Sequence, residues 1–271
     1  HPGVLARVRD YCSHVGDNEL VADRPETGLM VLAHLRARLD GGNVAAVFYE
    51  NPAYLGFFET QARRIADLAQ AAGAIVIGQP ELDSLGVVDS PANYGADIVC
   101  GDIQPLGIHM QYGGGCAGFI ATRQEEPYIR QYPTYLYGIT TTANEGEYGW
   151  GRALNYRCSH VGRENANEYY GTGVGLWAIV AGVYLALMGP QGMRELGEHI
   201  LQKCAYAVRK LAAIPTIAAN PFGGRNCQEF VVRFPSISVA EGNAAVLEKG
   251  IFGGKDLSAD FPHLGQCALY C

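Results

Sequence analysis

The sequence predicts an α/β fold built on a mainly parallel sheet with helices on both faces, followed by a small C-terminal α+β domain. Two observations support this prediction. In the first part of the chain, short buried-strand patterns alternate with helical patterns, which is typical of strands that pair in parallel through right-handed crossovers. Beyond Gly189-Pro190, shorter strand patterns are grouped around one helical pattern without that alternation.

The elements of the larger part are recognised by apolar spacing and by the residues that end them. Helical spacing is found at residues 4–11, 29–39 and 59–72. Strand patterns are found at residues 44–49, 74–77, 96–100 and 118–121. Because parallel strands end at one edge of their sheet, we expect residues 50–54, 79–85 and 101–104 along a single rim, where ligands of such sheets bind.

The second part begins with a long helical region. Residues 174–188 are apolar throughout and predict a buried helix, and residues 192–211 predict an amphipathic helix after the Gly189-Pro190 break. Strand patterns follow at 215–219, 229–234 and 267–270, with a helix at 240–249. We therefore expect a large domain over residues 1–190 and a small α+β domain over residues 191–271.

Composition excludes several classes of function. The net charge of −7 and the lack of any Lys/Arg block argue against nucleic acid as a partner. No apolar run reaches membrane-spanning length without a charge or a helix breaker, so we expect no membrane insertion. The 8 cysteines form no C-x-x-C pair, which favours reduced, structural thiols in a cytoplasmic protein and gives no candidate metal site.

One stretch carries most of the functional signal. The run GADIVCGDIQPLGIHMQYGGGCAGFIATR, residues 95–123, joins two strand patterns through a polar turn and three consecutive glycines, which bring bare backbone close to another body. This run resembles the corresponding segment of the alpha-type subunit, subunit 1, of the glycine decarboxylase P-protein family, whose members are fold-type-I pyridoxal-phosphate enzymes. The resemblance continues at residues 44–56, 183–196, 229–233 and 247–254.

The resemblance implies a pyridoxal-phosphate-transferase-like large domain and a two-subunit glycine decarboxylase of the glycine cleavage system. In that family the His1-Pro2 pair lies well inside the large domain, so we expect an N-terminal portion to precede it. The resemblance further implies a lysine-bearing beta-type partner subunit that binds most of the pyridoxal phosphate, and a lipoyl carrier protein that receives the aminomethyl group.

Matching the turn to the family gives no catalytic residue in this chain. Gln104 falls at the expected Schiff-base lysine position, and all 4 lysines lie beyond this region. The position of the carboxylate that keeps the cofactor's ring nitrogen protonated falls near Ile77, Gly78 or Gln79. Asp83 and Asp102 are the nearest acids, and a lone acid in a turn is more often a cap.

Seven residues are candidates for contact with the partner's cofactor. Gly171-Thr172-Gly173 precede an apolar helix and could bind a phosphate at its N-terminus; alternatively, Thr172 caps the helix between two glycines. His109, Tyr112, Gly113 and Gly114 surround the glycine turn and could face the partner's active site, although a turn histidine is commonly only hydrogen-bonded.

Residues 124–175 depart from the family pattern and are rich in tyrosine, tryptophan and arginine. Such enrichment indicates an interface, or an aromatic loop packed on its own domain. The divergence keeps two alternatives open: a subunit of a related pyridoxal-phosphate enzyme that acts on another amino acid, and a non-catalytic scaffold homologue.

Overall fold

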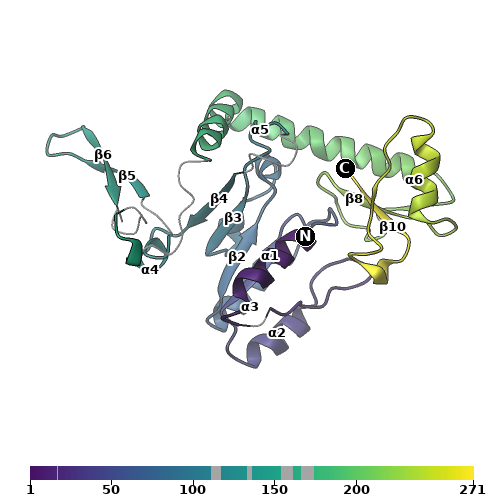
Figure 1. Ribbon diagram of the computed structural model, residues 1–271, viewed down its shortest axis with the longest axis horizontal. Helices are drawn as coiled ribbons and strands as arrows, with labels where there is room; N and C mark the ends of the chain where they lie inside the picture. Colours follow the sequence, from purple (N-terminus) through teal and green to yellow (C-terminus); the bar gives the residue numbers. More distant parts are fainter. Residues whose placement is uncertain (17, 111–116, 133–135, 154–160, 166–173) are drawn as a thin grey trace.

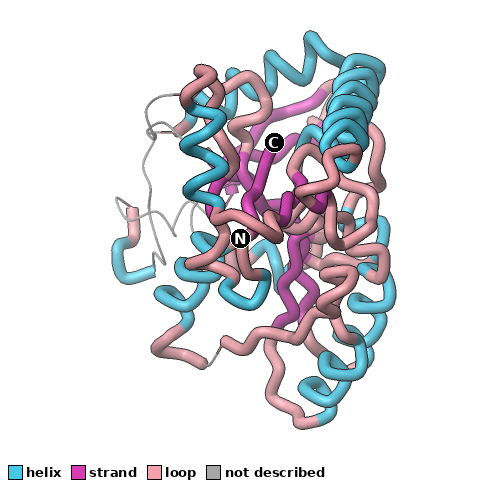
Figure 2. Tube along the Cα trace, turned by 90° about the vertical axis from the view of Figure 1, so that its right-hand side faces the viewer, coloured by secondary structure: helices cyan, strands magenta, loops and turns pink. Residues whose placement is uncertain are grey.

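The structure is a computed structural model that describes residues 1–16, 18–110, 117–132, 136–153, 161–165 and 174–271 (Figure 1). Figure 2 shows the strands in the interior of the molecule with most helices outside them. Two four-stranded sheets and one separate hairpin account for the strands of the described ranges.

The first sheet has the order β1-β2-β3-β4. The strands β1 (Ala46–Glu50), β2 (Ile75–Gln79) and β3 (Ile98–Asp102) are parallel, and β4 (Gly118–Thr122) pairs antiparallel with β3. Helices α2 (Leu32–Asp40) and α3 (Ala62–Ala71) pack on one face, where Leu35, Ile65 and Val76 are buried. A further helix, α1 (Pro2–Cys12), opens the chain. The predicted strands and the mainly parallel pairing are confirmed.

The long helix α5 (Gly175–Ala212) contains a break at Gly189, whose φ of 61° and ψ of 178° are not helical. It therefore corresponds to the two helices expected on either side of Gly189-Pro190. The prediction that the first of them is buried is wrong for one of its faces. Trp177, Ala181 and Tyr184 pack against the loop after β3, but Leu176, Ile179, Val183 and Leu187 are exposed. An apolar sequence predicts that a helix is removed from water. It does not predict whether the same chain or another molecule buries each face.

Among the described residues, α5 alone has the length and apolar composition that a membrane crossing would need, a property shared by core helices of soluble proteins. The apolar part before Gly189 covers residues 175–188, which at the usual rise is about 21 Å, shorter than the roughly 30 Å of a bilayer core.

The second sheet has the order β7-β8-β10-β9 and is antiparallel throughout. It contains β7 (Ala218–Ala219), β8 (Phe230–Arg233), β9 (Lys255–Asp256) and β10 (Cys267–Tyr270). Helix α6 (Val239–Leu247) begins at a capping box in which Ser238 and Glu241 bond each other's backbone N–H groups. The expected α+β arrangement is confirmed; the division of the chain near residue 190 remains a prediction.

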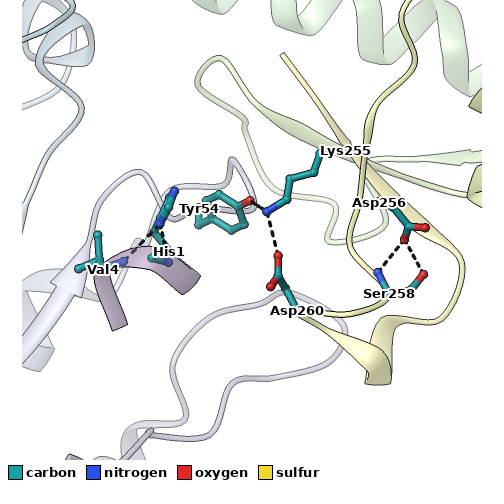
Figure 3. A network of polar contacts seen from close by, with 8 residues as sticks. His1, Val4, Tyr54, Lys255, Asp256, Ser258 and Asp260 are labelled. Carbon is teal, nitrogen blue, oxygen red and sulfur yellow. Dashed lines mark hydrogen bonds and ion pairs between the residues drawn. The ribbon is translucent and has the colours of Figure 1, made fainter. Parts of the chain in front are cut away.

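The two sheets are joined by a short backbone contact. Phe57 forms a β-bridge with Asn226, and the Cys227 N–H donates to the Gly56 carbonyl at 3.0 Å. Near this joint, the Lys255 Nζ of β9 donates to the Tyr54 hydroxyl and to Asp260 Oδ2, each at 2.8 Å (Figure 3). The rim of the first sheet is thereby held against the second sheet.

A hairpin stands away from both sheets on the side of β4 (Figure 1). Its strands are β5 (Leu136–Thr141) and β6 (Tyr148–Ala153), and the short helix α4 (Glu126–Ile129) precedes it. The sequence indicates a turn at residues 140–146; in the structure Thr140 and Thr141 still belong to β5, and residues 142–147 connect the two strands. The strands themselves were not predicted, because glycines interrupt their apolar alternation.

Candidate functional site

The carboxyl ends of the parallel strands lie along one rim, as the alternating pattern predicts. Glu50 of β1 is in register with Gln79 of β2, and β3 ends beside them at Asp102. Gln79 leads through Pro80 and Glu81 into the 3₁₀ helix η1 (Leu82–Gly86), which packs against α5. This rim is where a doubly wound sheet offers loop residues to a ligand.

The loop that follows β3 is folded by short-range hydrogen bonds. Asp102 Oδ1 accepts the N–H of Gln104 at 2.7 Å, and the Gln104 carbonyl accepts the N–H of Ile108 at 3.1 Å. Gly107 has a φ of 81°, and a Cβ there would lie 2.9 Å from the Tyr184 ring. Asp102 therefore caps the turn, which is the role expected of a lone acid in this position.

An open cavity of about 520 Å³ lies beside this loop. It is lined by Asp83, Gln104, Pro105, Gly107, Ile108 and His109. The rings of His109 and Trp177 are nearly perpendicular, with 6.3 Å between their centroids, so the start of α5 lies next to the loop that lines the cavity. The structure thus brings together Gln104 and His109, two of the residues that the sequence singles out. Their role toward a partner's cofactor stays a prediction.

The other candidate contacts lie outside the described residues: Tyr112, Gly113, Gly114, Gly171, Thr172 and Gly173. Among the described residues, helix α5 begins at Gly175 with Val174 at the N-cap position. Both interpretations of Thr172, as a phosphate contact and as a helix cap, therefore stay predictions.

All 4 lysines of the chain are among the described residues, and none lines the cavity. Lys203 and Lys210 are exposed on α5, Lys249 is exposed beyond α6, and Lys255 bonds Tyr54 and Asp260. The cofactor implied by the family resemblance needs a lysine for covalent attachment. The residues at this cavity do not fit pyridoxal phosphate held in that way.

Three acids near the rim have raised pKa values. Burial, followed by the charges of Asp83, Glu229 and Asp102, raises the pKa of Glu81 to about 7. Burial also raises the pKa of Asp83 and, from the second sheet's side, the pKa of Glu229. Within the described structure, Asp83 Oδ1 is buried without a hydrogen-bond partner. Such a group of acids repels a phosphate, so this part of the rim does not suit the anionic end of the cofactor.

Sequence reasoning placed Glu81 and Asp83 on the rim but missed Glu229. Glu81 follows β2 of the first sheet, Glu229 precedes β8 of the second sheet, and the two are far apart in the chain. Glu229 reaches the rim at the joint between the two sheets. Its backbone packs directly on Gly56, where a Cβ would lie 1.9 Å from the Glu229 carbonyl oxygen. No local pattern could have indicated this approach.

The fold and this rim define a chain of the fold-type-I pyridoxal-phosphate class. A crystal structure of the glycine decarboxylase (P-protein) of the glycine cleavage system, in inhibitor-bound form, matches with a TM-score of 0.83 and 29% identity, covering 100% of this chain and 59% of that one. A sphingosine-1-phosphate lyase of Burkholderia pseudomallei, at 14% identity and a TM-score of 0.66, shares the fold. The predicted fold class is thereby confirmed.

The family model of the glycine cleavage system P-protein matches residues 2–247, and the chain belongs to this family. The "Probable glycine dehydrogenase (decarboxylating) subunit 1" of Thermococcus onnurineus is 36% identical over 245 residues, which are 90% of this chain and 53% of that protein. The protein of the same name from Pyrococcus abyssi is 33% identical over 270 residues, covering 100% of this chain and 59% of its own length. The chain thus spans a little over half the length of these relatives.

Proposed function

We propose that this chain is the lysine-free, alpha-type subunit of a two-subunit, pyridoxal-phosphate-dependent glycine decarboxylase. In this proposal it completes the active site of a lysine-bearing beta-type partner and is inactive alone. Its similarity to proteins named subunit 1 of glycine dehydrogenase supports the proposal, because that name implies a second subunit.

One observation carries the proposal: Gln104 lines the rim cavity where the family resemblance puts the Schiff-base lysine. A glutamine amide cannot form an imine with an aldehyde, and all 4 lysines lie elsewhere. The same rim keeps the general architecture of the cofactor-binding fold. A chain that retains the architecture and lacks the attachment residue is best explained as the supporting half of a shared active site.

The partner's cofactor is expected to lie against the side of this chain that carries the glycine turn. His109 faces Trp177 beside the cavity, and Tyr112, Gly113, Gly114 and Gly171–Gly173 flank the same loop and helix in sequence. Backbone N–H groups of glycines approach phosphate oxygens closely, so these segments suit the cofactor's anionic end better than the acids around Glu81 do. A lipoyl carrier protein is the expected acceptor of the aminomethyl group.

A second candidate is a subunit of a related pyridoxal-phosphate enzyme that acts on another amino acid. The sequence departure at residues 156–175 favours it, because that segment borders the partner's cofactor in the family. The two candidates share the same architecture and differ in the substrate that the complex consumes. Release of carbon dioxide from glycine by the purified complex supports the first; turnover of another amino acid without glycine supports the second.

Reduction with borohydride tests the attachment of the cofactor directly. This chain alone, and the chain together with its lysine-bearing homologue, are incubated with stoichiometric pyridoxal phosphate, reduced, and measured by intact mass. We expect the pyridoxyl increment on the homologue and an unchanged mass for this chain. A stoichiometric increment on one lysine of this chain would overturn the proposal.

A further inference from the structure

One face of the β5–β6 hairpin carries bulky apolar side chains together with Arg152, which is opposite Tyr137, whereas Leu136 is on the reverse face. Ile139 is directly opposite Trp150 in the antiparallel register, and Tyr148 lies two residues before Trp150 on β6. Directly opposite residues, and residues two apart on a strand, share a face of the ribbon. We call Ile139, Tyr148 and Trp150 the aromatic face. The reverse face consists largely of small residues: Gly138, Thr140, Gly149 and Gly151.

The aromatic face is open to solvent. The exposed fractions are 78% for Trp150, 66% for Tyr148 and 57% for Ile139. Covering a side chain of this size is worth about 1.5–3 kcal/mol, and Tyr and Trp are the residues most enriched at interface cores. Figure 1 shows the hairpin projecting from the body of the molecule, and among the described elements its two strands lie chiefly against each other.

The hairpin is inserted between two segments that build the rim cavity. Before it, the stretch that leads into β4 bonds the cavity loop, since the Ala117 carbonyl accepts the Ile103 N–H at 2.9 Å. After it, α5 begins and places Trp177 against His109. The segments before and after the hairpin in the chain therefore both contact the loop that carries Gln104 and His109. A partner that binds the hairpin is expected to lie near this loop.

We propose that the aromatic face is a docking surface for the partner subunit, an inference that rests on the proposed function. The partner is expected to offer an apolar pocket to Trp150 and a basic surface to the hairpin turn. That turn carries Glu145 and Glu147, and the whole chain has a net charge of −7. A second copy of this chain has the same net charge and an anionic membrane has the same sign, so charge favours a different, more basic chain.

The test uses the chain co-produced with the lysine-bearing homologue of the same source. Trp150→Ser alters the aromatic face, and Phe252→Ser is the matched control, because Phe252 is 90% exposed on another part of the chain. We expect Trp150→Ser to raise the dissociation constant of the complex at least tenfold and Phe252→Ser to change it less than twofold. Both variants should unfold at the denaturant concentration of the parent, because both side chains are exposed.

A second variant tests the charge of the turn. Glu145→Lys should slow association with the homologue several-fold at low ionic strength, and the difference should vanish at about 0.5 M salt because ions screen exposed charges. Faster association, or a change that salt leaves intact, would contradict a basic partner surface at this turn.

The outcomes separate this inference from the proposed function. If the parent chain binds the homologue and Trp150→Ser binds as tightly, the aromatic face is not the docking surface and the proposed function stands. If the parent chain ignores the homologue, and instead forms homo-oligomers or floats with anionic vesicles, the two-subunit proposal fails and the docking surface fails with it.

Discussion

Residues 44–108 and residues 118–187 differ in how far their large apolar side chains are buried. In the first region Ile75 is the only exposed large hydrophobic residue, at 37%. In the second, the hairpin exposes Tyr148 and Trp150, and the start of α5 exposes Ile179 and Leu187. The first region buries its own core between α3 and the sheet, whereas the second displays apolar surface that its own described residues leave open.

This difference separates a region that covers its own apolar side chains from a region whose exposed apolar side chains we propose to be covered by a partner subunit. Soluble monomers rarely leave large apolar areas uncovered, because each buried side chain contributes to stability. The first region should therefore govern the free energy of unfolding of the chain. The second should affect association while changing that free energy little.

The largest expected change in the free energy of unfolding comes from comparing alanine substitutions at a buried and at an exposed isoleucine. Ile65 on α3 is fully buried, and Ile65→Ala should lower the free energy of unfolding by about 2–5 kcal/mol through lost burial and a cavity. Ile139→Ala on the exposed hairpin should lower it by less than about 0.5 kcal/mol. Urea unfolding of the two variants measures both values. Similar losses would show that the hairpin packs within the chain and would break the comparison.

The next effect concerns a buried charge on the rim. The pKa of Glu81 is raised from its ordinary 4.5 to about 7, first by burial and then by neighbouring acids. The folded state therefore holds this proton more tightly than the unfolded state does. The stabilisation of the folded state by this bound proton is fully present below pH 4.5 and is lost as the pH rises through 7. The loss is on the order of 3 kcal/mol.

Glu81→Gln removes this titration, and unfolding followed from pH 4.5 to 8 measures the difference between variant and parent. We expect the variant to gain stability relative to the parent across that interval. Glu145→Gln, at the solvent-exposed hairpin turn, is the control and should follow the parent curve. If the free energies of unfolding of Glu81→Gln and of the parent change with pH in the same way, then ionisation of Glu81 does not destabilise the folded state.

The smallest effect compares two glycines with the same backbone angle. Gly107 and Gly146 both have a φ of 81°, but a Cβ on Gly107 would lie 2.9 Å from Tyr184, and a Cβ on Gly146 would meet nothing within 4 Å. Alanine at either position strains the backbone by about 1 kcal/mol, and at Gly107 it also displaces a packed ring. We expect losses of about 2–3 kcal/mol for Gly107→Ala and about 1 kcal/mol for Gly146→Ala in urea unfolding. Equal losses would place Tyr184 in a looser setting than the contact indicates.

The sequence predicted the first region well because its signals are local. The strands β1, β2 and β3 are short runs of β-branched and aromatic residues ended by polar turns, and α3 repeats its apolar residues at helical spacing. The hairpin could not be predicted, because Gly138, Gly149 and Gly151 interrupt the alternation that marks a strand. The exposure of one face of α5 could not be predicted either, because the part of the helix before Gly189 is apolar on every side.

The candidate site was predictable in part and for a different reason. Gln104 was identified through family resemblance, because nothing in a glutamine alone marks a missing lysine. The burial of Glu81 beside Glu229 depends on how the two sheets meet, which no stretch of sequence carries. Long-range contacts of this kind require the fold itself.

Native mass spectrometry of the protein isolated from its own source, with the absorbance spectrum recorded on the same sample, tests the central claim most directly. We predict an assembly of two different chains with pyridoxal phosphate carried by the lysine-bearing partner, visible as absorbance that this chain lacks when purified alone. A colourless assembly made only of this chain would contradict the proposed function.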